Sequence, residues 1–495
     1  MAVLATLLVT VALLGCGLYA AYTDRDTVLT MVTFVMGFVG LLLTAVQTYP
    51  GITRHLRGAR RQFVYAVIVI FMAASATATS VILQRPVIKV AVSLPFTGGD
   101  KQDALPILRA VRQAVREEHG RIGNFDIQIV PFDDTNAEDR IQLMSSDGET
   151  VQRTGSLDTI TGDARVAGII GPFKSGTALV EVPQANASGI PLISPSATRD
   201  CLTADRCDGK DMGTSKTFFR TCVADRVRAK VLADFFSARE KPGAKSTEVA
   251  ILTDASIFGD AFGGAFADEW RVKHPTVDRP ILIPLTDDYD TLLKGLNPAP
   301  GLVLFAGTGP QGTALYRTMQ NDPVLRTATF SGPATIMNGA LNDILANGAG
   351  GELYAIAPMP YDNTSKSIVD FESAYGSMYG NQLPTPYSAS AYDAARSLLI
   401  AIREAVGSTR PPISGWNWLS QGQADAFRQK VVTKLRDLNR GTGVRYAGIT
   451  GTFNYAENGD VSFAGVGEAK TVAIYRYHQR GTGATAGGWR YERFE

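Results

Sequence analysis

The sequence is poor in cysteine and histidine, with four of each in 495 residues, and it has no excess of either charge. Lys and Arg total 48 against 47 Asp and Glu, so the formal net charge is +1. A chain this close to neutral has no global basic character that would favour binding to nucleic acid. The histidines lie far along the chain from Cys201 and Cys207, so the cysteine pair lacks the further ligands that a zinc site needs.

Catalytic signatures are missing as well. The chain contains no G-x-S-x-G, no H-E-x-x-H and no G-x-x-x-x-G-K-[ST] pattern. The sequence therefore favours a protein that is not an enzyme and that uses no metal and no cofactor.

One stretch does raise a cofactor question. Residues 307–312 read GTGPQG, which has the G-x-G-x-x-G spacing of a dinucleotide site between a strand and a helix. Such a site needs an acidic residue about 20 positions further on to hold the ribose. The next strand region, TATFSGPA at 327–334, ends in Gly-Pro-Ala instead. We interpret the glycines as a tight turn between a strand and a helix.

Long uncharged runs are confined to residues 1–85. Three of them, at about 2–22, 27–49 and 63–83, are long enough to cross a bilayer as helices. The loop at 50–62 carries four arginines, so the positive-inside rule makes it cytoplasmic. We expect a three-helix membrane anchor with a cytoplasmic N-terminus and an extracytoplasmic globular part.

A cleaved signal is the alternative for the first run, because Leu13-Leu14-Gly15-Cys16 resembles a lipoprotein processing site. The charged n-region of such a signal is absent, and Cys16 is better explained as a helix residue. Either way the globular part lies outside, where Cys201 and Cys207, separated by five residues, can form a disulfide. Cys222, in FFRTC, is expected to be a buried thiol.

From Val87 onward, apolar strands alternate with amphipathic helices. VIKVAVSLPF is followed by ALPILRAVRQAVREEHG, which has apolar residues at helical spacing, and then by the strand FDIQIVPFDD. Similar rounds continue to the end of the chain. Strands alternating with helices predict mostly parallel sheets in more than one α/β domain.

Several stretches in order resemble the type I periplasmic binding proteins, specifically the leucine/isoleucine/valine-binding family of ABC importers. They are IKVAVSLPFTG, IIGPFKSGTALVEVPQANASGIPLISPSAT, FFRTCVAD, VAILTDASIFGDAFGGAF, GELYAIAPMPYD, PYSASAYDAARSLLIAI and GTFNYAENGDV. The second stretch is the most specific. The resemblance extends from about Val87 to the C-terminus and does not include the membrane anchor.

The resemblance implies two doubly wound α/β lobes joined by a three-strand hinge, in the manner of a Venus flytrap. Lobe one would comprise 87–219 and 358–450, and lobe two 220–357 and 451–495. The ligand would lie in the cleft between the lobes, and Thr308 of the GTGPQG turn would face it.

In relatives that bind amino acids, the ligand carboxylate is held by a serine of the G-P-x-x-S turn and by the SPSAT stretch. The matching positions here are Ser175, Ser196 and Thr198, and all three retain hydrogen-bonding groups. A helix N-terminus after the turn would also favour an anion. The same residues are ordinary helix caps and turn residues, which is the structural alternative.

The other half of the site departs from the family pattern. Relatives hold the ligand ammonium with an acidic residue after Gly-Pro, where this chain has Ala334. Phe258 stands where relatives stack a hydroxylated aromatic residue, and Thr308 where they have a tyrosine. Asp254 or Asp393 can in principle substitute, although each is better explained as a solvated or capping residue. An amine-free carboxylate or a similar metabolite is therefore expected.

These features predict a membrane-tethered solute receptor that closes on a small carboxylate-bearing ligand and serves ABC-type uptake of amino-acid-like compounds. Its partners would be the ligand and ABC permease subunits. Two alternatives remain: a ligand sensor that signals through a partner chain, and a scaffold whose lobes bind a protein. The cytoplasmic side offers little beyond the loop at 50–62, so any signalling output requires a second chain.

Overall fold

The computed structural model describes residues 86–135, 143–144, 150–151, 157–213, 216–240, 248–308, 310–337, 341, 344–345, 350–361, 365–407, 421–478 and 488–492. The three apolar spans predicted at about 2–22, 27–49 and 63–83 lie outside these residues. Among the helices that the structure describes, none combines the length and the apolar character needed to cross a membrane.

A six-stranded sheet is the centre of lobe one. Its strands lie in the order β10 (Phe218–Arg220), β7 (Leu192–Ser194), β6 (Val166–Ile170), β1 (Val87–Leu94), β3 (Phe125–Asp133) and β2 (Arg121–Ile122). Neighbours from β1 to β10 pair in parallel. All five residues of β6, VAGII, are buried, which is the continuous apolar run expected of a central parallel strand.

A seven-stranded sheet is the centre of lobe two. Its order is β12 (Leu282–Pro284), β11 (Val249–Thr253), β13 (Leu302–Ala306), β14 (Thr329–Pro333), β15 (Leu353–Ala357), β19 (Ala473–His478) and β20 (Gly488–Glu492). The first five strands pair in parallel, whereas β19 and β20 are antiparallel additions. The C-terminal segment therefore completes this sheet, and the prediction of mostly parallel sheets is confirmed.

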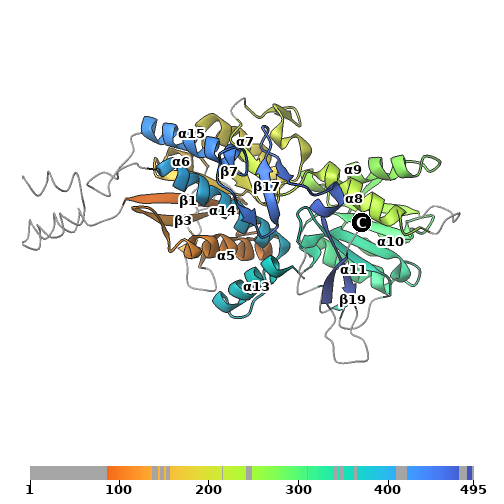
Figure 1. The fold of residues 1–495 in the computed structure, drawn as a ribbon. Coiled ribbons are helices and arrows are strands. Elements are labelled where there is room, and N and C mark those ends of the chain that lie inside the picture. The colour runs from red at the N-terminus through yellow and green to blue at the C-terminus, as the bar shows by residue number, and fades with distance from the viewer. Residues whose placement is uncertain are drawn as a thin grey trace, which may run out of the picture. The chain divides into compact units, whose positions relative to one another are not determined.

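The helices of lobe one include one that the apolar spacing predicted well. They are α5 (Lys101–Glu117), α6 (Leu157–Gly162), α7 (Ser175–Ser188), α13 (Lys366–Met378), α14 (Pro386–Val406) and α15 (Gln421–Asp437). In α5, Ala104, Ile107, Leu108 and Val111 are all buried, at the expected helical spacing. Helix α5 runs beside β1 and β3 (Figure 1) and packs against α14.

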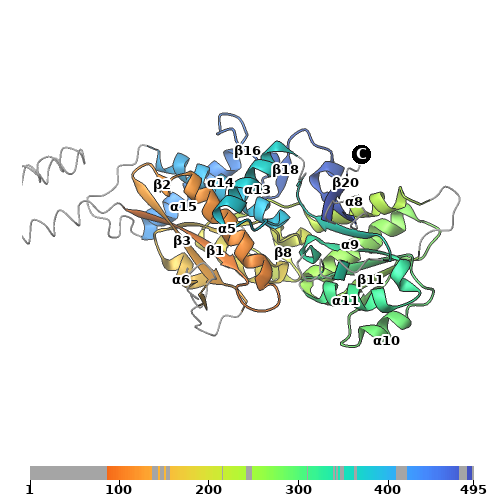
Figure 2. The same ribbon diagram turned by 90° about the horizontal axis from the view of Figure 1, so that it is seen from below.

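The helices of lobe two are α8 (Asp225–Ser237), α9 (Ile257–Lys273), α10 (Tyr289–Lys294) and α11 (Pro310–Asn321). Helix α8 packs on α9, and α9 packs on β11 and β13, as can be followed in Figure 2. The buried face of α9 carries Phe262, Phe266 and Trp270 at a spacing of four residues. This apolar stripe anchors the helix to its sheet.

Three small sheets complete the described structure. They are β4 (Leu143–Met144) with β5 (Thr150–Val151), β8 (Arg206–Cys207) with β9 (Lys210–Asp211), and β16 (Ala447–Gly448), β17 (Gly451–Tyr455) and β18 (Val461–Phe463). The hydroxyl of Tyr455 lies 2.9 Å from that of Ser397 on α14, and its ring lies 5.0 Å from that of Phe219. Strand β17 thus packs against elements of lobe one.

Candidate functional site

A cavity lies where the loops after β6, β7, β11, β13 and β14 meet the start of α14. It contains about 560 Å³ of space free of protein atoms, its open mouth included. The residues that line it are Phe173, Lys174, Ser175, Gly176, Ser196, Arg228, Ser256, Ile257, Phe258, Thr308, Pro333, Thr335 and Tyr387. Parallel α/β sheets bind ligands at this position, beyond the carboxyl ends of their strands. The charged residues among these are two cations, Lys174 and Arg228.

The turn between β6 and α7 forms one wall. A Cβ at Gly171 would lie 2.1 Å from the backbone oxygen of Ser93, so only glycine fits there. The turn then brings Lys174 and Ser175 to the first residues of α7, and Ser175 is only 2% exposed. The Ser175 hydroxyl accepts a hydrogen bond from the backbone N–H of Arg199 at 3.4 Å. Free N–H groups at the start of α7 add an anion-favouring field to this wall.

The turn after β7 forms the adjoining wall. Ser196 donates its hydroxyl to the backbone oxygen of Phe173 at 2.8 Å, which links the two turns. The hydroxyl oxygen retains a lone pair with which it can accept another hydrogen bond. Ser194, the last residue of β7, accepts from the N–H groups of Ser196 and Ala197 and fixes the turn from behind.

Lobe two contributes Phe258 and Thr308 to the cavity wall. Helix α9 begins after Ser256, whose hydroxyl accepts from the N–H of Gly259 at 2.9 Å. The carboxylate of Asp254 accepts from the N–H groups of Ser256 and Thr308, each at 3.0 Å. Asp254 therefore braces these two turns, in line with its interpretation as a capping residue, and does not line the cavity.

Arg228 is a cavity residue that the sequence did not reveal. It lies on α8 with its side chain 1% exposed, and it pairs at 2.5 Å with Asp225, which is fully buried. Its guanidinium lies 4.8 Å from the ring centre of Phe258 and 4.0 Å from that of Phe262. In the sequence, Arg228 is one arginine in the polar string DRVRAK, with no local signal to set it apart.

Tyr387 is a second residue that sequence reasoning missed. It is the second residue of α14, whose start is fixed by a capping box between Thr385 and Ser388. Its ring meets that of Phe173 edge-on, with centres 5.4 Å apart. Burial raises the pKa of Tyr387 above its ordinary value of 10.0, so the hydroxyl stays protonated at neutral pH.

Of the six ligand-binding residues predicted from the sequence, the structure brings four to the cavity wall: Ser175, Ser196, Phe258 and Thr308. Thr198 is fully buried beside it, with its backbone oxygen accepting from the N–H of Asp225 at 2.8 Å. Ala334 is 4% exposed in a short 3-10 turn, and its neighbours Pro333 and Thr335 line the cavity in its place.

Asp393 lies away from the cavity. It is fully buried on α14 and accepts from the N–H groups of Ile449 and Thr450 at 3.0 and 2.9 Å, and from the Tyr446 hydroxyl at 2.6 Å. Burial raises the pKa of this carboxyl. Of the two interpretations from the sequence, a solvated or a capping residue, the structure agrees with the second: Asp393 is buried and accepts from the N–H groups of the loop at 449–450, which it holds to α14.

Two glycines of the GTGPQG turn, Gly307 and Gly312, are explained by packing. A Cβ at Gly307 would lie 2.6 Å from the ring of Phe305, and a Cβ at Gly312 would lie 2.7 Å from the same ring. Helix α11 begins at Pro310 and lies close to β13 for this reason. The tight strand-to-helix turn predicted for this segment is confirmed.

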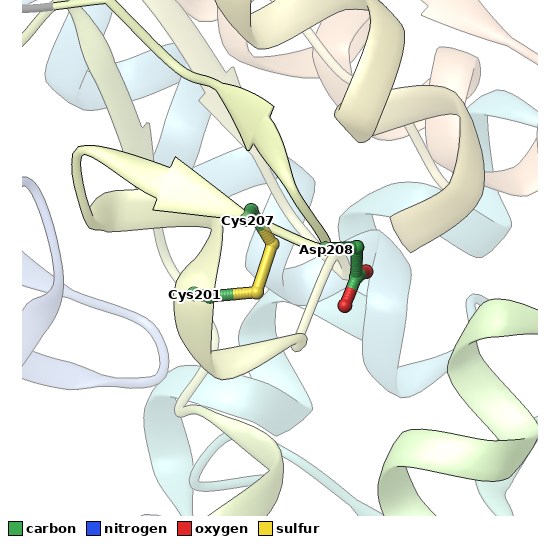
Figure 3. A group of neighbouring side chains, drawn as sticks. All are labelled: Cys201, Cys207 and Asp208. Atoms are coloured by element: carbon green, nitrogen blue, oxygen red, sulfur yellow. A yellow bond between two sulfur atoms is a disulfide. The ribbon is translucent and has the colours of Figure 1, made fainter.

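Cys201 and Cys207 form the predicted disulfide, with Asp208 beside it (Figure 3). In the described part of the chain this trio is the one group of metal-ligand side chains found close together, and its sulfurs are bonded to each other. Asp208 pairs with Arg199, which also donates to the backbone oxygen of Ile257 at 3.3 Å. Cys222 is fully buried, as predicted, and burial raises its thiol pKa to about 12.

Two α/β lobes with a cavity beyond their strand ends have the architecture of a bilobal ligand-binding protein. A family model described as periplasmic binding protein matches residues 150–458, and the chain belongs to this family. The resemblance drawn from the sequence motifs is thereby confirmed, and members of the family are substrate-binding proteins.

Two curated relatives agree with this assignment. The Leu/Ile/Val-binding protein BraC3 of Rhizobium johnstonii is 24% identical over 340 residues, which cover 68% of this chain and 80% of the relative. The substrate-binding protein BasB of a chemotactic signal transduction system in Halobacterium salinarum is 26% identical over 309 residues, covering 59% of this chain and 67% of the relative.

Solved structures share the fold. A leucine-binding protein, LivK, from Thermotoga maritima aligns with a TM-score of 0.58 at 18% identity, covering 82% of this chain and 98% of the other. A solute-binding protein of an ABC transporter from R. palustris, in complex with benzoate, aligns with a TM-score of 0.59 at 17% identity, covering 83% and 98%. At these identities the likeness establishes the fold alone.

Proposed function

We propose that this protein is an extracytoplasmic solute receptor that closes on a small carboxylate lacking an amino group. The observation that carries the proposal is the charge of the cavity wall. Its charged residues are Lys174, which pairs with Asp100 at 2.6 Å, and Arg228, which pairs with Asp225 at 2.5 Å. Both acidic partners lie outside the lining, so the charged groups that a ligand meets among the described lining residues are these two hydrogen-bond donors. With Ser175 at the start of α7 and Ser196 beside it, this wall is suited to an anion.

An α-amino acid fits this wall poorly. Its ammonium group, desolvated in the cavity without a carboxylate partner, would cost several kcal/mol. The nearest candidate counter-charge from the sequence, Asp254, is engaged by the N–H groups of Ser256 and Thr308. Where relatives have an acidic residue this chain has Ala334, and no other carboxylate among the described lining residues takes over its role of pairing with an ammonium group.

The relatives support the carboxylate part of the proposal. One is named for leucine, isoleucine and valine, and one structural neighbour holds benzoate. These ligands share a carboxylate and differ in the amino group. Closure of the two lobes around such a ligand would be the state that a partner recognises.

We further propose that three N-terminal helices, at about 2–22, 27–49 and 63–83, tether the receptor with its N-terminus in the cytoplasm. The support is the length of the apolar runs and the four arginines of the loop at 50–62. A tethered receptor stays within reach of ABC permease subunits in the same membrane. Its encounter with them then depends on the high local concentration that the tether gives, and not on free diffusion. Uptake of amino-acid-like carboxylates is the role that fits this arrangement best.

Sensing is the second candidate, and the Halobacterium relative favours it because that protein belongs to a chemotactic system. The two candidates share the ligand and differ in the partner. Cross-linking of the full chain in its native membrane separates them: a permease subunit as the captured neighbour supports uptake, and a transducer supports sensing.

The ligand proposal is tested by thermal unfolding of the full chain in detergent with matched pairs of solutes. 4-Methyl-2-oxopentanoate and L-leucine share a carbon skeleton and differ in the amino group. A solute present at about 100 times its dissociation constant stabilises the fold by roughly 2.7 kcal/mol. We expect stabilisation by carboxylates without an amino group; stabilisation by the α-amino acids alone would contradict the proposal.

A further inference from the structure

The cavity has three aromatic rings on its wall, and they come from different parts of the chain. Phe173 follows β6, Tyr387 begins α14 and Phe258 lies in the first turn of α9. The ring of Phe258 is stacked on that of Phe262, with centres 5.9 Å apart and planes 4° from parallel. Ile257 and Pro333 add further apolar surface. Such a wall favours a flat apolar group over a branched one.

Arg228 lies over the rings of Phe258 and Phe262 and has an unmet hydrogen-bonding group. Its Nη2 donates to Asp225, while its Nε is buried and has no partner among the described residues. A buried donor of this kind is costly unless something accepts from it. Stacking over Phe258 and Phe262 fixes the plane of the guanidinium, so its donors are already oriented before a ligand arrives.

We infer that the ligand is an aromatic carboxylate and that Arg228 supplies its counter-charge, with the ring of the ligand packed against the aromatic rings of the cavity wall. This inference rests on the proposed carboxylate receptor and names its substrate class. A planar ring can pack on these rings face to face or edge-on, and its carboxylate lies in the plane of the ring, where it can reach the edge of a guanidinium.

Isothermal titration of the full chain with three probes of similar size tests the class of ligand. Benzoate carries the ring and the charge, cyclohexanecarboxylate carries the charge on a puckered ring, and benzamide carries the ring without the charge. We expect benzoate to bind at least about tenfold more tightly than either of the others, since aromatic stacking and a charged hydrogen bond each contribute on that scale.

The outcomes separate the two proposals. If cyclohexanecarboxylate binds as tightly as benzoate, the carboxylate receptor stands and the aromatic inference is overturned. If benzamide binds as tightly as benzoate, the role of Arg228 is overturned. If no carboxylate without an amino group binds, the proposed function itself fails.

Variants of α8 and α9 test the residues. Arg228→Gln alone leaves Asp225 buried without its partner, so the double variant Asp225→Asn/Arg228→Gln is used, in which both members become neutral. We expect it to bind benzoate at least about tenfold more weakly while its affinity for benzamide is unchanged. Arg226→Gln is the matched control, because that exposed side chain lies on the same helix and pairs with Asp200 outside the cavity.

Phe258→Leu tests the ring contact. It keeps apolar bulk but removes the stacked face, so benzoate affinity should fall about fivefold to tenfold while that of cyclohexanecarboxylate stays the same. Equal losses for both ligands would show that Phe258 provides only apolar volume, and an unchanged benzoate affinity in the double variant would overturn the assignment of Arg228.

Discussion

Asp225 and Arg228 form an ion pair one helical turn apart, with 2.5 Å between carboxylate oxygen and guanidinium nitrogen and with both side chains almost completely buried. The pair occupies the first turn of α8, where Asp225 is favourably placed at the helix N-terminus. Its desolvation is offset by mutual attraction and by the stacking of Arg228 on two phenylalanine rings. Neither member is stable alone at this depth.

Asp225→Ala should therefore lower the free energy of unfolding by about 3–5 kcal/mol, because it leaves a buried guanidinium without a partner. The double variant Asp225→Leu/Arg228→Met removes both charges and should recover most of the loss. Urea unfolding of the full chain followed by tryptophan fluorescence measures both. Equal destabilisation by the single and double variants would show that packing of these side chains, and not their charge pairing, contributes the stability.

Two carboxyl groups, Glu181 on α7 and Asp134 directly after β3, make stability depend on pH. The Ser93 hydroxyl donates to Glu181 at 2.6 Å and lies 3.4 Å from an oxygen of Asp134. Burial, with the charge of Asp134 added, raises the pKa of Glu181 to about 8. Burial, with the charge of Asp133 added, raises the pKa of Asp134 to about 7. In the unfolded chain Glu181 has the ordinary glutamate pKa of 4.5, so it loses its proton near pH 4.5. The folded protein keeps that proton to a higher pH.

Stability should accordingly fall as the pH rises from about 4.5 to about 8 and then level off. Glu181→Gln cannot ionise, so at pH 8 it should gain at least about 1 kcal/mol relative to the wild type, and little at pH 5. Thermal melts over this pH range measure the difference. Glu404→Gln, at an exposed position of α14, is the control and should follow the wild-type curve; an unchanged slope in Glu181→Gln would refute the prediction.

Ser175→Ala should weaken binding of a carboxylate about tenfold, the scale of a hydrogen bond to a charged group. Ser175 opens α7 and is 2% exposed at the cavity wall. Ser188→Ala is the matched control, because that serine ends the same helix, donates to the backbone oxygen of Ala185 at 3.1 Å and is not among the residues that line the cavity. Titration with benzoate or 4-methyl-2-oxopentanoate compares the two, and equal affinities would remove Ser175 from the site.

Gly312→Ala should destabilise the fold by about 1–3 kcal/mol, because its Cβ would lie 2.7 Å from the ring of Phe305 in a packed interior. Gly264→Ala is the helical control: on α9 its Cβ would meet only the end of Arg279, at 3.9 Å, so a gain of up to about 1 kcal/mol is expected. Urea unfolding gives both values. A neutral Gly312→Ala would mean that the glycine of GTGPQG has no packing role.

Reduction of the disulfide should cost about 2 kcal/mol, the chain-entropy value for a loop this small. Cys201→Ser/Cys207→Ser should lose the same amount and should be insensitive to dithiothreitol. The bridged loop holds Asp208 beside Arg199, and Arg199 donates to the backbone oxygen of the cavity residue Ile257. Loss of the disulfide should therefore also lower the affinity for benzoate. Unfolding with and without reductant tests the first expectation, and a reductant effect that persists in the variant would contradict it.

The sequence predicted those parts of the fold that depend on local pattern. Apolar spacing in α5, the fully apolar β6, the Gly-Pro turn before Ser175 and the short cysteine loop each carry their signal within a few residues. The same holds for the family motifs, which pointed to Ser175, Ser196, Phe258 and Thr308, four residues that line the cavity. The predicted membrane spans lie outside the described residues and remain predictions.

Only the tertiary structure decided which polar residues are buried and which of them face the cavity. Arg228 and Tyr387 line it and had no local signal, while Thr198 and Ala334, chosen by motif, lie behind the wall. The reason is physical. A periodic pattern predicts which face of a helix or strand is apolar, but the groups that surround a charged side chain come from segments distant in the chain. Arg228 is a cavity residue because α9, some 30 positions later, places two phenylalanine rings against it.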